Sequence, residues 1–254
     1  MQTPTALVAR RDIPLALGLL TRLPVPVDAG FAQARGAGAA WAYPLAGLAA
    51  AMIAGGIGWG AAALGLPAGV AAGLALTAQI VLTGAMHEDG LADAADGLWG
   101  GWSRERRLEI MKDSRMGAYG TLALILSVGL RWAALAALDP AMLLPAMVAA
   151  ALLSRAVMVG VMAALPNARD GGLSRGIGRP RTATAVLAAM LALGLSVAVA
   201  GPAALALALV AVAAAAGSAA IARAKIGGQT GDILGATQQM AEIACLTLAT
   251  ALPG

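Results

Sequence analysis

Three aspartates are the residues of this sequence whose spacing points most directly to chemistry. Asp89, Asp93 and Asp96 lie within segment 87–97, and on an α-helix they would fall at i, i+4 and i+7, on one face. Like charges at this spacing cost about 0.2–0.5 kcal/mol per pair, and no basic residue stands one turn away to offset them. Mg²⁺ prefers carboxylate oxygens, keeps several waters and is often completed by substrate phosphates. We interpret the three aspartates as an Mg²⁺ site, with a solvated acidic helix face as the alternative.

A second group of residues has the chemistry to bind phosphate and to move a proton. Lys112 and Arg115 lie in segment 104–117, which the pattern predicts to be an interfacial amphipathic helix. On such a helix the two cations are one turn apart and can hold phosphate oxygens. Asp113 places another carboxylate beside them, and His87 is a candidate ligand or general base, with a structural role equally open.

Two glycine-rich loops carry the remaining candidates. Segment 169–176 contains Arg169 and is too rich in glycine for a stable helix, so substrate binding and topology-setting charge are equal alternatives for it. Gly228, Thr230 and Asp232 precede a predicted helix, where backbone N–H groups suit an anion. N-capping by Thr230 or Asp232 is the alternative role.

The composition indicates what kind of scaffold positions these residues. Of the 254 residues, 60% are hydrophobic and 12% are charged, against roughly 25% charged residues in soluble domains. The apolar residues form long runs, which is typical of a single, all-α, polytopic integral membrane domain spanning 1–254. Cys245 is the single cysteine, so neither an intrachain disulfide nor a cysteine metal cluster can form. The net charge of +4 is dispersed rather than gathered in a stripe, which argues against nucleic-acid binding.

Windows of about 20 apolar residues predict seven membrane-spanning helices. They lie near 41–62, 69–86, 118–138, 141–164, 182–200, 203–222 and 233–252. The turns at Asp139-Pro140 and Gly201-Pro202 divide the longest apolar stretches. The shorter apolar stretch 13–20 lacks a cleavage pattern and predicts an interfacial or re-entrant helix rather than a removed signal.

The basic residues predict the orientation of these helices. The segments expected on the inner side are 1–40, 87–117, 165–181 and 223–232. They contain every Lys and Arg except Arg131 and Arg155, whereas the opposite turns contain none. The positive-inside rule therefore predicts a cytoplasmic N-terminus and an active site that faces the cytoplasm of a prokaryotic inner membrane.

Three charged residues fall inside predicted membrane spans. Glu242 lies roughly two and a half turns into the last span, and intramembrane acids usually face the interior of a bundle. Arg131 or Arg155 could pair with Glu242 or extend its charge to the membrane surface, and the sequence leaves both alternatives open.

Five motifs, in this order, resemble the pattern of one enzyme family, the cobalamin synthases or adenosylcobinamide-GDP ribazoletransferases. They are Leu20-Thr21-Arg22-Leu23-Pro24, Tyr43-Pro44 with Gly47, segment 87–97, segment 107–115 with Gly117, and Gly227-Gly228 with Thr230-Gly231-Asp232 and segment 234–239. The resemblance spans nearly the whole chain. Glu88 and Gln229 depart from it, standing where the family often has an apolar and an aromatic residue.

The resemblance implies an Mg²⁺-dependent membrane enzyme of cobalamin biosynthesis. Such an enzyme joins adenosylcobinamide-GDP to α-ribazole or its 5′-phosphate, releases GMP and forms adenosylcobalamin or its 5′-phosphate. The aspartates of segment 87–97 would hold Mg²⁺, Lys112 and Arg115 would clamp phosphate, and Asp113 or His87 could take the hydroxyl proton. The implied partners are the corrinoid and ribazole substrates and the lipid bilayer. A homo-oligomer or an association with other cobalamin-assembly enzymes is left open.

Three other classes of membrane protein are alternatives. A CDP-alcohol phosphotransferase expects Asp-Gly-x-x-Ala-Arg, but Asp89-Gly90-Leu91-Ala92 is followed by Asp93. A prenyltransferase expects further aspartate-rich motifs, and only one Asp-x-x-x-Asp element is clear. A transporter would use Glu242 and Arg155 as pathway residues, yet most of the acids lie outside the predicted spans.

Overall fold

The computed structural model describes residues 6–252, which form twelve α-helices and one 3₁₀ helix, with no strand among these residues. The helices are α1 (Asp12–Leu20), α2 (Ala29–Arg35), η1 (Gly36–Ala42), α3 (Tyr43–Ala63), α4 (Ala68–Thr83), α5 (Met86–Gly100), α6 (Arg104–Ile110), α7 (Ala118–Ala137), α8 (Pro140–Ala164), α9 (Leu173–Ile177), α10 (Thr182–Ala200), α11 (Ala203–Ile226) and α12 (Gly231–Ala249). The predicted all-α bundle is confirmed, and each of the seven predicted spans coincides with a helix.

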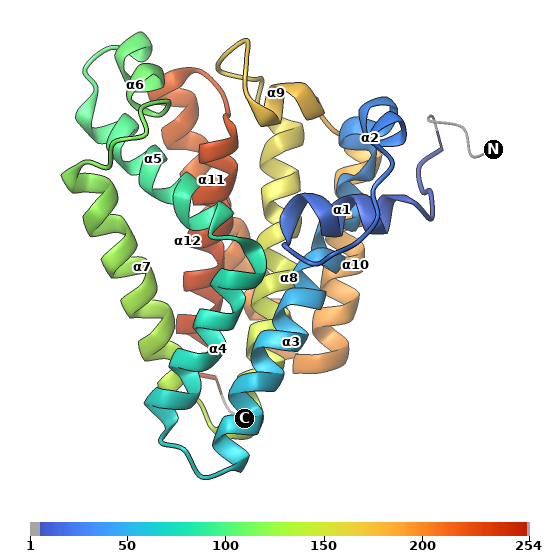
Figure 1. Cartoon of the computed structure of the whole chain (residues 1–254), viewed down its shortest axis with the longest axis vertical. Coiled ribbons are helices and arrows are strands. Elements are labelled where there is room, and N and C mark those ends of the chain that lie inside the picture. The colour runs from blue at the N-terminus through green and yellow to red at the C-terminus, as the bar shows by residue number, and fades with distance from the viewer. Residues whose placement is uncertain (1–5, 253–254) are drawn as a thin grey trace.

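Long helices run along one axis of the molecule, and α8 lies at their centre (Figure 1). The most apolar window of α8 is 78% buried, whereas those of α10 and α11 are 22% buried. α3, α10, α11 and α12 pack around α8. Small residues permit close approach, since a Cβ atom on Gly47 would lie 2.6 Å from the carbonyl oxygen of Ala151.

The number of helices able to cross a membrane differs from the predicted seven. By length and apolar composition, five segments qualify: Ala29–Ala63, α7, α8, α10 and α11. α4 and α5 together qualify as a sixth, bent by 85° at their junction. α12 is not among them because it carries Asp232, Gln238, Gln239 and Glu242, most of which the neighbouring helices bury. The chain is thus a multi-pass membrane protein in which protein, rather than lipid, surrounds the polar α12.

A sharp bend separates the apolar α4 from the acidic α5. Gly84 and Ala85 both have positive φ angles, 63° and 55°, which end one helix before the next begins. At Gly84 the Arg22 guanidinium packs directly against the glycine, where a Cβ atom would displace it. The predicted helix 69–86 therefore ends at Thr83, and α5 begins as a separate helix that packs against α7 and α12.

The N-terminal segment is fastened to the bundle by a buried ion pair. α1 confirms the helix predicted over 13–20 and lies across the bundle axis against α3 (Figure 1). Both carboxylate oxygens of Asp12 accept from Arg35, at 2.7 Å each, and Trp41 Nε1 donates to Asp12 at 2.6 Å. Asp12 is fully buried, so this bidentate pair holds α1 against η1.

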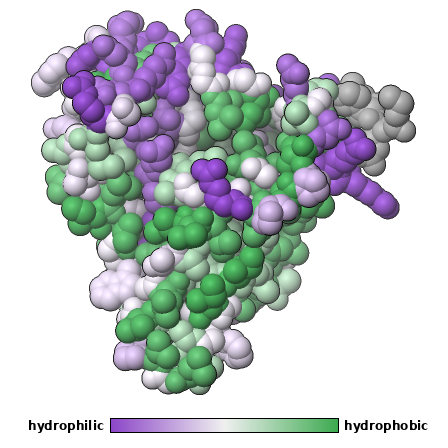
Figure 2. Space-filling model, in the orientation of Figure 1, coloured by the Kyte–Doolittle hydropathy of each residue, from purple (hydrophilic) through white to green (hydrophobic). Residues whose placement is uncertain are grey.

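The polar and apolar parts of the surface are separated along the bundle. Figure 2 shows hydrophilic residues gathered at the end that carries α6 and the α5 terminus, and mostly hydrophobic residues toward the other end. Large side chains exposed on the helix sides include Leu122, Ile125 and Leu126 of α7 and Leu209 of α11. The lower end suits lipid, and the candidate site residues belong to the upper end.

Candidate functional site

α5 carries the three predicted aspartates, but their surroundings differ. Asp89 is exposed, whereas Asp93 and Asp96 are half-buried. Asp96 accepts hydrogen bonds from two backbone N–H groups, those of Gly117 at 2.7 Å and Gly120 at 2.9 Å. It therefore caps the N-terminus of α7, with a charge that suits the positive end of the helix dipole. Asp96 has this structural role in addition to any role toward a metal ion.

Asp93 lies at the centre of a group of charges that comes from three parts of the chain. Burial, followed by the neighbouring carboxylates of Asp89, Asp232 and Asp96, raises the pKa of Asp93, and Arg169 lowers it, so that the pKa is about 6. Arg169 Nη2 lies 3.3 Å from Asp232 Oδ2. We call Asp89, Asp93, Asp232 and Arg169 the acidic site. Sequence spacing did not reveal that Asp232 and Arg169 join the α5 aspartates.

The carboxylate oxygens of the acidic site fit an Mg²⁺ ion whose remaining ligands are waters and substrate phosphates. Within residues 6–252, no group of three or more His, Cys, Asp or Glu side chains is placed to hold a metal ion unaided. Mg²⁺ is commonly bound by one or two carboxylates together with waters and substrate phosphates. Asp89 and Asp93 supply such oxygens, and the mutual repulsion at Asp93 is the kind that a cation relieves.

The two glycine-rich loops are held together by a hydrogen-bonded latch. Gln229 N donates to the carbonyl of Pro166, and Ala168 N donates to the carbonyl of Gln229, both at 2.8 Å. The buried Gln229 side chain also accepts from Ser174 Oγ and donates to Asn167 Oδ1, at 2.7 Å each. The latch fixes Arg169 relative to Asp232 and explains why a polar residue is accommodated at position 229.

Gly228 and Thr230 serve this local structure. Thr230 Oγ1 accepts from Ile233 N at 3.3 Å as the N-cap of α12, and it donates to Asp232 Oδ2 at 3.1 Å. Gly228 permits the contact between the loops, because a Cβ atom there would collide with the Pro166 carbonyl oxygen. Anion binding by this segment stays a prediction, whereas the capping alternative is what the structure contains.

Gly228→Ala is expected to open the latch and to lower both activity and thermal stability. The added methyl group has to displace the Pro166 carbonyl, which moves Arg169 away from Asp232. Gly176→Ala is the matched control, since no atom lies within 4 Å of a Cβ atom built there. Melting temperature in detergent and steady-state turnover should fall in the first variant and stay near wild type in the second. Equal behaviour of the two variants would contradict the latch.

A cleft with several charged side chains adjoins the acidic site. Its walls are Arg104, Glu105, Leu108, Glu109 and Lys112 on one side and residues 167–171, including Arg169, on the other. Arg104 connects the two walls of the cleft, since its guanidinium donates hydrogen bonds to the carbonyls of Ile226 at 2.9 Å and Ala168 at 2.6 Å. Lys112 is exposed there, so the predicted phosphate ligand Lys112 shares one cleft with Arg169, a candidate for substrate binding.

Arg115 and Asp113 pair with each other. The predicted helix over 104–117 ends at Ile110, because Asp113 accepts from Arg115 N and from its guanidinium and so stabilises a turn. The expected one-turn spacing of Lys112 and Arg115 is therefore absent. The Arg115 guanidinium lowers the pKa of Asp113 to about 2, which makes Asp113 a weak proton acceptor.

Comparison with known proteins relates this arrangement to one family. A family model described as cobalamin-5-phosphate synthase matches residues 12–250. The chain belongs to that family. Adenosylcobinamide-GDP ribazoletransferases of Mesorhizobium japonicum, Bradyrhizobium diazoefficiens and Azorhizobium caulinodans are 47%, 45% and 46% identical to it. The alignments cover 94%, 94% and 92% of this chain and 92%, 93% and 93% of the relatives. No solved structure matches. The family resemblance seen in the motifs is confirmed.

His87 of this cobalamin-5-phosphate synthase family member faces away from the acidic site. Residues two apart on a helix point about 200° apart, so His87 and Asp89 occupy nearly opposite faces of α5. His87 is buried, and its Nε2 atom has no hydrogen-bond partner within the described residues. A role as general base stays a prediction, and the position places His87 beside an apolar pocket.

The interior of this family member contains a buried cluster of four charges, which answers the question left open for Glu242. Arg131 Nη1 lies 2.9 Å from Glu88 Oε1 and 3.3 Å from Glu242 Oε1, and Arg155 Nη1 lies 3.9 Å from Glu242 Oε2. All four residues are at least 94% buried, so both arginines pair inside the bundle and neither reaches the membrane surface. Two acids balance two bases, as burial requires.

Proposed function

We propose that this chain is an Mg²⁺-dependent adenosylcobinamide-GDP ribazoletransferase that uses α-ribazole or its 5′-phosphate as acceptor and releases GMP. The observation that carries this proposal is 47% identity to a ribazoletransferase over 94% of this chain and 92% of that relative. The acidic site and the adjoining cleft lie together at the polar end of a membrane bundle, an arrangement that suits a reaction between charged, water-soluble groups.

The proposed reaction forms a bond from a ribazole hydroxyl oxygen to the phosphorus attached to cobinamide and breaks the bond from that phosphorus to GMP. The hydroxyl proton passes to water, and GMP leaves as an anion with the bonding electron pair. Asp89 and Asp93 would hold Mg²⁺, which when bound supplies positive charge to the phosphate oxygens. Lys112 and Arg169 would bind phosphate from the cleft side. Asp96 and the latch would keep these groups in place.

A direct assay tests this function. Protein purified into nanodiscs is supplied with adenosylcobinamide-GDP, α-ribazole 5′-phosphate and Mg²⁺, and GMP and the corrinoid product are separated by chromatography. We expect equal amounts of GMP and of a corrinoid that carries the lower base, with loss of both after EDTA and recovery on adding Mg²⁺. Turnover that persists in EDTA contradicts the Mg²⁺ assignment, and absence of both products contradicts the function.

The Mg²⁺ requirement is expected to increase below about pH 6. The pKa of Asp93 is about 6 against an ordinary 3.8, so Asp93 in the folded protein takes up a proton as the pH falls through 6. A proton competes with Mg²⁺ for one carboxylate, which raises the half-saturating Mg²⁺ concentration about tenfold per pH unit below that pKa. Titrations of activity with Mg²⁺ at pH 5, 6 and 7.5 measure this. A half-saturating concentration that does not change with pH would remove Asp93 from the ion's ligands.

We also infer that the N-terminus and the acidic site face the cytoplasm of a bacterial inner membrane. The dispersed Lys and Arg residues at one end of the bundle support this orientation. Cys245 is buried, so the labelling of a single introduced cysteine shows on which side of the membrane that cysteine lies. Arg175→Cys is expected to react with an impermeant maleimide only after the cells are opened, whereas Leu64→Cys, at the other end and 83% exposed, should react in intact cells. The reverse pattern would invert the topology.

A further inference from the structure

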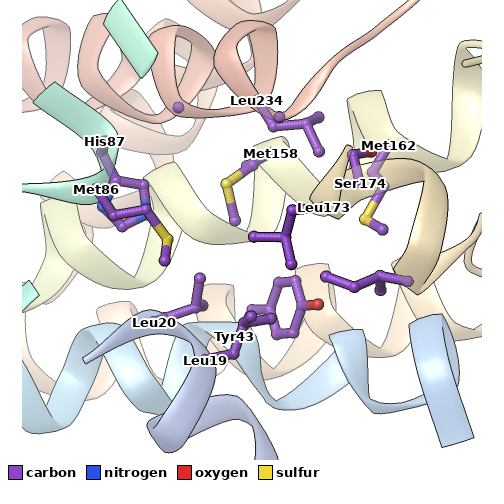
Figure 3. Close-up of a pocket in the computed structure, with 13 residues that line it drawn as sticks. Leu19, Leu20, Tyr43, Met86, His87, Met158, Met162, Leu173, Ser174 and Leu234 are labelled. Atoms are coloured by element: carbon purple, nitrogen blue, oxygen red, sulfur yellow. The ribbon is translucent and has the colours of Figure 1, made fainter. Parts of the chain in front are cut away.

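An apolar pocket lies within the bundle and reaches the start of α12, the helix that carries Asp232. Helices α1, α3, α5, α8, α9 and α12 enclose it, and Figure 3 shows their side chains converging on it. Leu20, Tyr43, Met86, Met158, Leu173 and Leu234 supply much of its lining. Methionine side chains adapt their shape to flat ligands and make favourable contacts with aromatic rings, and Tyr43 adds an aromatic ring of its own.

Histidine supplies the pocket with a polar group that has no partner. Ser174 Oγ also lines the pocket, but it already donates to Gln229 Oε1 at 2.7 Å. His87 is 2% exposed, and its Nε2 atom has no hydrogen-bond partner within residues 6–252. A buried polar atom without a hydrogen-bond partner carries a free-energy cost. A ligand that returns one hydrogen bond to His87 would recover that cost.

The pocket and the acidic site share two helices. Gly231 lines the pocket, and Asp232 of the acidic site follows it at the start of α12. On α5, His87 lines the pocket, whereas Asp89 lies on nearly the opposite face of the helix. A molecule bound in the pocket can therefore extend past the start of α12 toward Asp232.

We propose that this pocket binds the aromatic base of the ribazole acceptor, an assignment that rests on the proposed function. That base is a dimethylbenzimidazole, an uncharged bicyclic ring whose single free nitrogen accepts a hydrogen bond. One acceptor on the ligand matches one unpartnered nitrogen in the pocket, with His87 Nε2–H as the donor. Guanine, the other base in the reaction, carries several donors and acceptors that this lining would leave unpaired, at a cost for each.

Gly231 offers a substitution that fills the pocket without disturbing the backbone. No atom lies within 4 Å of a Cβ atom built on Gly231, and its φ angle is outside the range that strains other residues. Gly231→Val therefore adds its side chain to open space at the pocket wall. Gly217→Val is the matched control, because Gly217 of α11 also has open space and lies outside the pocket.

The test combines steady-state kinetics with direct binding of α-ribazole to the full chain in nanodiscs. Gly231→Val is expected to raise the KM for α-ribazole at least about 10-fold and to weaken its binding equally, about 1.4 kcal/mol. The KM for adenosylcobinamide-GDP should stay within about 2-fold, and Gly217→Val should match wild type. Unchanged KM and binding of α-ribazole would overturn the assignment. A rise confined to the corrinoid substrate would overturn it too, as would a copurified lipid in the pocket that α-ribazole does not displace.

A second pair of variants tests the hydrogen bond itself. His87→Phe keeps a ring but removes the donor and should weaken α-ribazole binding, whereas His87→Gln places an amide N–H nearby and should restore part of it. Equal binding by both variants would remove His87 from the contact. If the wild type binds α-ribazole but releases no GMP, the proposed function fails while the pocket stands. If it releases GMP and Gly231→Val changes nothing, the pocket fails alone.

Discussion

Asp89→Asn and Asp93→Asn are each expected to lower kcat/KM by at least about 100-fold while leaving the protein folded. A factor of 100 corresponds to about 2.7 kcal/mol of lost transition-state stabilisation. Asparagine keeps the side-chain shape but removes the charge that would hold a cation, and Asp89 is exposed while Asp93 is strained by neighbouring carboxylates. Removing either charge therefore should not unfold the protein, and Asp93→Asn relieves repulsion.

The double variant and two comparison variants sharpen this test. Ligands of one ion act as a unit, so Asp89→Asn with Asp93→Asn should be scarcely slower than the slower single variant. Asp96→Asn should lower the melting temperature as well, because Asp96 accepts from both Gly117 N and Gly120 N. Asp139→Asn at the other end is the control, since asparagine caps a helix as well as aspartate. Near-normal rates for Asp89→Asn and Asp93→Asn at limiting Mg²⁺ would return both residues to a solvated acidic face.

Arg131→Leu is expected to destabilise the fold by about 3–5 kcal/mol, the usual cost of leaving a buried charge without its partner. Arg131 lies within hydrogen-bonding distance of Glu88 and Glu242, and all three are buried. Its loss leaves two acids with Arg155 as the single base of the cluster. Thermal and denaturant unfolding in detergent should both report the change, and the yield of folded protein should fall.

A double variant separates lost charge balance from lost packing. Arg131→Leu combined with Glu88→Gln restores equal numbers of acids and bases and should recover part of the stability, whereas a simple packing defect would persist. Arg223→Leu, an exposed arginine of α11, should remain near wild type. If Arg131→Leu unfolds at the wild-type temperature, the interior cluster does not stabilise the bundle.

Features encoded by neighbouring residues were predictable from the sequence. The apolar runs located all seven long helices, and the aspartate spacing predicted one face of α5, because both follow from local period and composition. The helix over 13–20 was likewise predictable. The number of membrane spans was harder to predict from the sequence. α12 is polar by composition, and it is enclosed by α5, α7, α8 and α11.

Features that depend on distant partners were not predictable. Asp96 looks like its neighbours in sequence, and only the approach of Gly117 and Gly120 makes it a helix cap. The fold brings Asp232 close to Asp93, and it also brings Asp12 close to Arg35. Glu242 was recognised as an unusual intramembrane acid, but its partners could be either arginine until the helices were placed.

The contact between α4 and α12 has a consequence for how the protein is made. Gln79, near the end of α4, donates to Glu242 of α12 at 2.8 Å, across 163 residues of sequence. At about 5–20 residues per second, a ribosome needs roughly 8–30 s to make that stretch. Unpaired polar groups are costly within lipid. The buried contact between Gln79 and Glu242 can therefore form only after α12 has been made, so α12 completes this part of the interior last.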